Sequence, residues 1–232
     1  TSFALNLLLH AGKFSGKTVV FFSLEMSREQ LCMRLISSES FVDNKKLVTG
    51  KLGEDDWTKI AAASAALNQT QILIDDNPSL SVADMNAKCR RVDNLGLVVI
   101  DYLQLMTSAG GPQRSGDNRQ QIVSDISRAL KIMAKELNVP VVCLSQLSRG
   151  PESRSDKRPM LSDLRESGAI EQDADIVMFL YRDDYYNDDS ENHNLAECII
   201  AKNRHGETRT VELQWLPEYT TFSSIDRRHE EY

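Results

Sequence analysis

The chain of 232 residues is poor in cysteine, and its cysteines do not cluster. No two of them stand in Cys-x-x-Cys spacing, and they are spread along the chain at Cys32, Cys89, Cys143 and Cys198. Zinc sites and the disulfide frameworks of secreted proteins both need closely spaced or numerous cysteines. We therefore expect neither, and we expect a protein of the reducing cytoplasm.

Long hydrophobic runs and an excess of positive charge are also missing. No apolar stretch approaches the roughly 20 residues of a membrane-spanning helix, and we find no signal-peptide pattern. The formal net charge is −7 at pH 7, which argues against a protein that coats nucleic acid with its whole surface but leaves room for a local basic channel. The lack of long apolar runs leads us to expect a protein that does not bind membranes. Because internal repeats and breaks in composition are absent too, we expect a single domain over residues 1–232.

What the chain does contain is a series of short apolar runs separated by helical patterns. These runs lack the alternation of a half-buried strand and are typical of strands buried on both faces; they cover residues 18–24, 97–100, 141–145 and 175–181. Residues 195–202 and 208–215 flank a hairpin connection, and a last strand is expected at 221–225. The pattern predicts an α/β fold with a mostly parallel sheet and antiparallel strands at its C-terminal end.

Polar residues follow several of these strands. Asp101 ends one run, Glu25 follows another, and Gln146 follows a third. In open α/β sheets, ligands bind at the carboxyl ends of the strands. Aspartate is suited to Mg²⁺, glutamate to the role of general base, and a polar side chain to sensing a terminal phosphate. We therefore expect a nucleotide-hydrolysis site here, and Lys202 and Arg204 are further candidate residues of this site. The alternatives are a capping role for Asp101 and a solvated loop position for Glu25.

The start of the chain predicts a helix over residues 1–14, with Gly12 suited to end it. Gly12 to Thr18 resembles a phosphate-binding P-loop, but its spacing is one residue short of G-x-x-x-x-G-K-[ST]. The order is also reversed, since a helix precedes this segment and a strand follows it. We interpret it as a helix-to-strand turn. Further on, Ser27 and Gln30 form a capping-box pattern that predicts a helix from about residue 27 to 38.

Six segments together resemble the DnaB family, in the order found in that family. They are TSFALN (1–6), FSLEMS (22–27), VIDYLQLM (99–106), LSQLSR (144–149), LRESGAIEQDAD (164–175) and AKNRHG (201–206). The resemblance covers essentially the whole chain and implies the C-terminal, RecA-like motor domain of a bacterial replicative helicase. It also implies that most of the P-loop, an N-terminal helical domain and a linker helix are absent from this sequence.

The resemblance assigns roles around the nucleotide. Thr1 matches the last threonine of the P-loop, a Mg²⁺ ligand, and Asp101 matches the Walker B aspartate. Glu25 matches the catalytic glutamate, and Gln146 matches the glutamine that senses the γ-phosphate of ATP. Lys202 and Arg204 match a basic finger that reaches the neighbouring subunit's site, with ordinary hairpin charges as the alternative.

The resemblance also implies a DNA-binding loop and partners. Arg165, Glu166 and Gly168 match the loop that lines the central DNA channel, with the segment 107–118 placed near it; a surface pair without a partner is the alternative for the first two. Family members are homohexamers that bind single-stranded DNA, primase and a helicase loader.

We therefore predict an ATP-dependent DNA helicase motor that uses ATP and Mg²⁺. A related RecA-like ATPase, such as a recombinase or a signalling ATPase, and a non-enzymatic fragment are the alternatives. Without most of the P-loop, residues 1–232 alone are expected to be inactive if they are the whole polypeptide.

Overall fold

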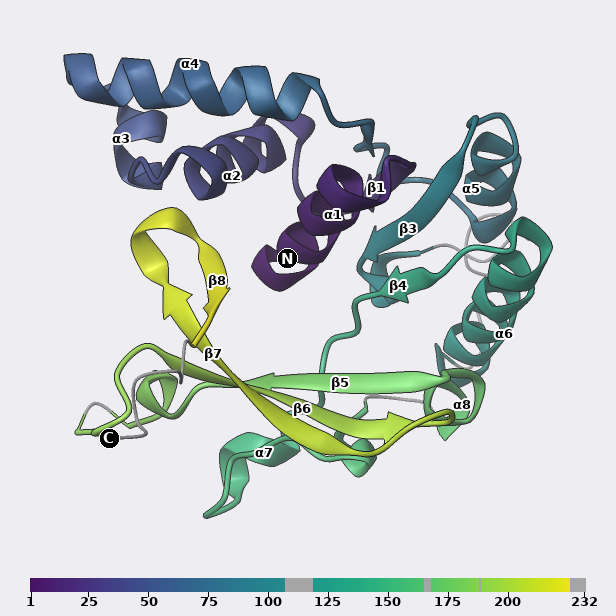
Figure 1. The fold of residues 1–232 in the computed structure, drawn as a ribbon. Coiled ribbons are helices and arrows are strands. Elements are labelled where there is room, and N and C mark those ends of the chain that lie inside the picture. Colours follow the sequence, from purple (N-terminus) through teal and green to yellow (C-terminus); the bar gives the residue numbers. More distant parts are fainter. Residues whose placement is uncertain (107–118, 165–167, 188, 226–232) are drawn as a thin grey trace.

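A four-stranded parallel sheet forms the centre of the computed structural model, which describes residues 1–106, 119–164, 168–187 and 189–225. Its strands lie in the order β2-β1-β3-β4, of which β1, β3 and β4 are labelled in Figure 1. Their bounds are β1 Thr18–Ser23, β2 Ile72–Asp75, β3 Leu95–Asp101 and β4 Val141–Cys143. Every residue of β1 is buried, which explains its continuous apolar sequence.

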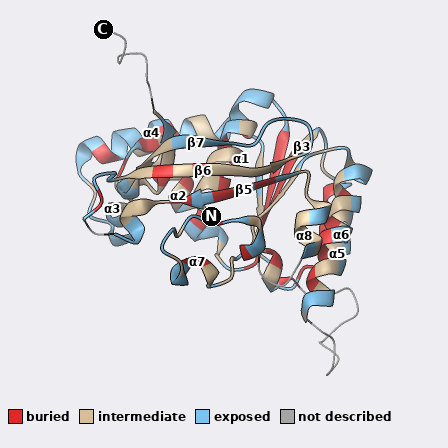
Figure 2. Ribbon diagram, turned by 90° about the horizontal axis from the view of Figure 1, so that it is seen from below, coloured by how far each residue is buried: buried red, intermediate tan, exposed pale blue. Residues whose placement is uncertain are grey.

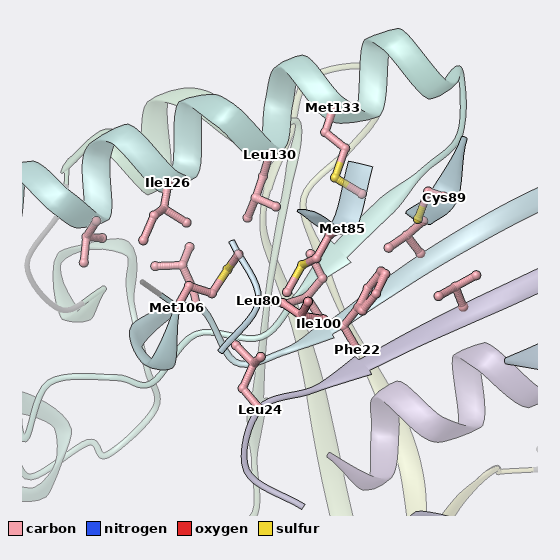
Figure 3. Close-up of a cluster of buried hydrophobic side chains, with 14 residues drawn as sticks. Phe22, Leu24, Leu80, Met85, Cys89, Ile100, Met106, Ile126, Leu130 and Met133 are labelled. Atoms are coloured by element: carbon pink, nitrogen blue, oxygen red, sulfur yellow. The ribbon is translucent and has the colours of Figure 1, made fainter. Parts of the chain in front are cut away.

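Helices cover both faces of this sheet. On one face, α1 (Ser2–Ser15) and α2 (Arg28–Ser40) pack leucines against the side chains of Phe21 and Val99. On the other face, α5 (Val82–Cys89) and α6 (Arg119–Leu137) pack against Phe22 and Ile100 (Figure 3). In Figure 2 the buried residues gather in the strands and on the inner faces of these helices. The result is a three-layer α/β/α arrangement.

Helix α1 ends later than predicted. Gly12 lies inside the helix, and the chain leaves it at Gly16, whose φ of 63° is the left-handed conformation that glycine adopts most easily. A Cβ atom at Gly12 would lie 3.3 Å from Cγ2 of Val19 and 3.4 Å from Cγ1 of Ile72. The glycine therefore serves the close approach of the helix to the sheet, and the prediction that it ends the helix is wrong.

The C-terminal strands form a second, antiparallel sheet in the order β5-β6-β7-β8. They cover β5 Ile176–Tyr181, β6 Leu195–Asn203, β7 Arg209–Leu216 and β8 Thr221–Ser224. The predicted fold class, a mostly parallel sheet followed by antiparallel strands, is confirmed. The prediction that residues 175–181 are buried on both faces is wrong, because β5 is an edge strand whose residues alternate between exposed and buried.

Strand β8 joins this second sheet to the first layer of helices. The Asn6 side chain of α1 donates to Thr221 Oγ1 at 2.5 Å and accepts from the backbone N–H of Phe222 at 2.9 Å. The rings of Phe3 and Phe222 meet edge to face at 5.7 Å. Since α1 also packs on β1 and β3, this helix connects the two sheets.

Further helices and 3₁₀ turns lie in the connections between these elements. They are α3 (Asn44–Thr49), α4 (Glu54–Asn68), α7 (Gly150–Ser153), α8 (Gly168–Asp173) and the 3₁₀ turns η1 (Leu103–Leu105), η2 (Leu161–Asp163), η3 (Asp183–Tyr185) and η4 (Pro217–Tyr219). Among the described residues, no helix is both long and apolar enough to cross a membrane.

Candidate nucleotide site

Thr1, which precedes α1, and Asp101, the last residue of β3, meet at the carboxyl edge of the parallel sheet. Asp101 ends β3 and is only 3 % exposed. Thr1 precedes α1, and its Oγ1 atom donates a hydrogen bond to Asp101 Oδ2 at 2.5 Å. This contact spans 100 positions of sequence and exists because α1 packs directly on β1 and β3. The structure therefore brings the two predicted metal ligands together.

Glu25 lies on the turn that follows β1, at the same edge. The register places Ser23 opposite Asp101, and the backbone N–H of Leu24 donates to the Asp101 carbonyl at 2.8 Å. The Ser23 hydroxyl closes the turn, since it donates to the Met26 carbonyl at 2.7 Å and accepts from the Met26 N–H at 3.1 Å. The Glu25 side chain is exposed and has no hydrogen-bond partner in the described part of the chain.

The helix after Glu25 begins with the predicted capping box. Gln30 N–H donates to the Ser27 hydroxyl at 3.4 Å, and Ser27 N–H donates to Gln30 Oε1 at 3.1 Å. The prediction is confirmed, with the helix starting at Arg28. The turn that carries Glu25 is thus bounded by the Ser23 contacts on one side and by a capped helix on the other.

Gln146 follows β4 at the same edge of the sheet. Pairing between β3 and β4 ends at Ile100 and Cys143, and the Leu144 N–H then donates to the Ile100 carbonyl at 2.9 Å. Gln146 is exposed, and its side-chain amide has no hydrogen-bond partner within the described ranges. Glu25, Asp101 and Gln146 therefore follow adjacent strands β1, β3 and β4, as the sequence predicted.

The Cys143 thiol lies behind the carboxylate of Asp101. Burial, and to a smaller extent the negative charge of Asp101, raise the pKa of this thiol to about 12. A thiol with such a pKa stays neutral at physiological pH and is a poor metal ligand or nucleophile. The chemistry at this edge therefore depends on oxygen and amide groups.

The donor set at this edge fits a magnesium ion. Mg²⁺ prefers oxygen ligands and is usually held by one or two protein groups, with phosphates and water completing the octahedron. Thr1 and Asp101 supply one hydroxyl and one carboxylate, already in contact. Among the residues that the structure describes, no group of three or more His, Cys, Asp or Glu side chains could hold a metal by itself.

Lys202 and Arg204 lie elsewhere, at the far end of β6 in the second sheet. Lys202 Nζ donates to the backbone carbonyl of Glu171, and an Arg204 guanidinium nitrogen donates to the Gln172 carbonyl at 2.6 Å. Both carbonyls belong to α8 (Figure 1). The sequence left open whether these two residues join Glu25, Asp101 and Gln146 at the strand ends. In the part of the chain that the structure describes, they do not.

The predicted DNA-binding residues are only partly described. Arg165 and Glu166 lie outside the described residues, as does the segment 107–118. Gly168 is exposed and begins α8. Helix α8, whose carbonyl groups bind Lys202 and Arg204, therefore begins at Gly168, a residue of the predicted DNA loop.

Sequence reasoning missed three residues that support this site. Ser23 closes the Glu25 turn, Asn6 anchors β8, and Gln104 hydrogen-bonds residues 145 and 146. All three lie in or beside the segments that carry the family resemblance. The sequence could have pointed to them through their polar side chains, because a polar side chain next to a buried strand needs a hydrogen-bond partner.

A parallel sheet with helices on both faces and polar side chains at its carboxyl edge places the protein in the RecA-like class of α/β folds. Comparison with protein families agrees, since residues 1–224 match the model of the DnaB-like helicase C-terminal domain. The chain belongs to this family.

Individual relatives support the same assignment. The chain is 54 % identical to the replicative DNA helicase DnaB of Geobacillus stearothermophilus, over 100 % of this chain and 51 % of that protein. It resembles a solved ATPase domain with a TM-score of 0.90 and 41 % identity, covering 96 % of this chain and 79 % of that one. A solved DnaB-like replicative helicase, described together with its interactions with primase, gives a TM-score of 0.88 and 41 % identity over 96 % of this chain and 54 % of that one. The chain spans about half the length of the curated relatives it matches.

Proposed function

We propose that this chain is the ATP-hydrolysing motor of a replicative DNA helicase. The observation that carries the proposal is the contact between Thr1 and Asp101 at an edge that also holds Glu25 and Gln146. Family membership adds to it, because the segments that contain these residues are those that resemble the DnaB family.

Each residue at the edge has a distinct chemical task in this proposal. Thr1 and Asp101 hold Mg²⁺, which when bound neutralises charge on the phosphates. Glu25 accepts a hydrogen bond from the attacking water and orients it toward the terminal phosphate. The Gln146 amide donates a hydrogen bond to an oxygen of that phosphate and so distinguishes ATP from its product.

Lys202 and Arg204 act in a neighbouring subunit in this proposal. Both side chains hydrogen-bond carbonyl groups of α8, and the Arg204 guanidinium also lies 3.8 Å from Asp175 Oδ1. In a ring of identical subunits, such a pair can reach the phosphates bound next door and stabilise the charge of the transition state, an effect worth about 10³ or more in rate. The proposal therefore includes a homohexamer with nucleotides between subunits.

Single-stranded DNA is the proposed track of this motor. Arg165 would bind its phosphates from the loop that also carries Glu166 and Gly168, so binding should weaken with salt and depend little on base sequence. Primase and a helicase loader are the proposed protein partners, and the bacterial cytoplasm is the proposed compartment, because a replicative helicase acts on the chromosome there.

The proposal is tested by replacing Glu25 with glutamine in the complete gene product. Glu25→Gln removes the base but keeps the size of the side chain, so ATP hydrolysis should fall by about 10² to 10⁴ while ATP binding stays near normal. Glu29→Gln is the matched control, because Glu29 is exposed in the first turn of α2. It should hydrolyse ATP like the unmodified protein.

A forked-DNA substrate separates helicase from recombinase function. The unmodified protein should separate the strands in the presence of ATP, and Glu25→Gln should bind the fork without separating it. Full ATP turnover by Glu25→Gln would contradict the assignment of the base. Coating of single strands without unwinding by the unmodified protein would favour a recombinase.

A further inference from the structure

Gln104 connects the strand that carries Asp101 to the segment that carries Gln146. It lies in η1, the 3₁₀ turn three residues after Asp101. Its Nε2 atom donates to the Ser145 hydroxyl at 2.9 Å and to the Gln146 carbonyl at 3.3 Å. Its Oε1 atom accepts from the Gln146 backbone N–H at 3.0 Å. One side chain thus holds both backbone groups of Gln146.

These contacts begin where the backbone pairing of the sheet stops. Beyond the β3–β4 ladder, the last backbone bonds join Leu144 N–H to the Ile100 carbonyl and Leu103 N–H to the Leu144 carbonyl, both at 2.9 Å. After Leu103 the chain winds into η1, so it offers Gln146 no neighbouring backbone strand. The primary amide of Gln104 replaces that strand, because it presents a donor and an acceptor side by side as a peptide group does.

The side chain of Gln146 is exposed and makes no hydrogen bond to other described residues. Its direction is therefore set by its own backbone, which Gln104 holds at both the N–H and the carbonyl. We propose that Gln104 is a positioning residue for Gln146, which aims the amide of Gln146 at the terminal phosphate of ATP. This inference rests on the proposed function, in which Gln146 contacts that phosphate.

The first experiment measures steady-state ATP hydrolysis by the complete gene product with Gln104→Met. Methionine has nearly the same length but provides none of these three hydrogen bonds. A misplaced catalytic group costs up to about 10² in rate, so we expect kcat to fall roughly 10-fold to 100-fold. The KM for ATP should change far less, because in this inference Gln104 acts on the backbone of Gln146 and not on the nucleotide itself. Gln69→Met is the control, since Gln69 is exposed at the end of α4, and it should leave both constants unchanged.

The second experiment combines this variant with Gln146→Ala. If Gln104 acts only through Gln146, the double variant should be as slow as Gln146→Ala alone, because no amide remains to be aimed. Multiplied losses in the double variant would overturn the positioning role. A normal kcat for Gln104→Met beside a slow Gln146→Ala would overturn the inference and leave the proposed function standing. A normal kcat for Gln146→Ala would instead refute the proposed role of Gln146, and the inference with it.

Gln104→Glu keeps the test decisive if the methionine variant does not fold, as judged by circular dichroism. Glutamate matches glutamine in size and still accepts from the Gln146 N–H, but it cannot donate to the Gln146 carbonyl. Its kcat should lie between those of the unmodified protein and Gln146→Ala. In the Gln146→Ala background the same change should cost nothing further, even though it introduces a charge; an equal loss in both backgrounds would contradict positioning.

Discussion

Helix α6 offers a sharp test of the packing beneath the candidate site, because two neighbouring residues differ in burial. Met133 is fully buried in the cluster that also contains Met85 and Ile100 (Figure 3). Ile132, the preceding residue, is 49 % exposed. Successive residues of a helix point about 100° apart, so one faces the sheet and the other faces away. Replacing each with alanine compares the two environments on one helix.

The magnitudes follow from burial. Met133→Ala removes three heavy atoms from a closely packed core and leaves a cavity, and buried Met→Ala changes cost about 2–5 kcal/mol. We expect about 3 kcal/mol, because no part of Met133 is exposed. Ile132→Ala loses only part of its apolar burial and gains from the higher helix propensity of alanine. Its cost should be about 1 kcal/mol or less.

Urea-induced unfolding, followed by circular dichroism, measures both free energies. A loss of 3 kcal/mol in a domain of this size should also lower Tm by roughly 10 °C. Equal destabilisation by the two variants, or a greater loss for Ile132→Ala, would refute the orientation of α6 over the sheet. A change in the urea dependence itself would point to an altered unfolded state rather than to lost packing.

Two further predictions concern a buried carboxylate and a helix cap. Hydrogen bonds from Arg154 hold the pKa of Asp163 below its usual range. The folded chain therefore binds fewer protons at this carboxylate than the unfolded chain does. The resulting stabilisation is present above about pH 4 and is lost as the pH falls through the folded-state pKa. The difference in unfolding free energy between the unmodified protein and Asp163→Asn should therefore stay constant from pH 7 to about 5 and shrink in more acidic solution; a difference that grows with acid would contradict this sign. Ser27→Ala should cost about 1 kcal/mol and speed amide exchange in the first turn of α2, whereas Ser27→Asp should keep the cap and most of the stability; equal exchange in both variants would count against the capping box.

Local sequence determined much of this fold. The apolar run at 97–100 is buried as β3 because its Val/Ile-rich residues fit no solvated surface, and the capping box at Ser27 and Gln30 starts its helix as predicted. Glu25, Asp101 and Gln146 follow adjacent strands because parallel strands present their carboxyl ends at one edge. The strand and the helix cap depend on residues close together in sequence, where period and chemistry are sufficient evidence, whereas the shared edge follows from the parallel fold class that the pattern predicts.

The tertiary structure decided the rest. The contact of Thr1 with Asp101, and that of Gln104 with Gln146, each join residues far apart in sequence. An apolar run specifies that it must be buried but not against which partner, so the single-sided burial of β5 and the close approach at Gly12 could not be read from the chain. Such pairings are settled only when helices and strands pack, because side-chain volume and unpaired hydrogen-bonding groups then select one arrangement.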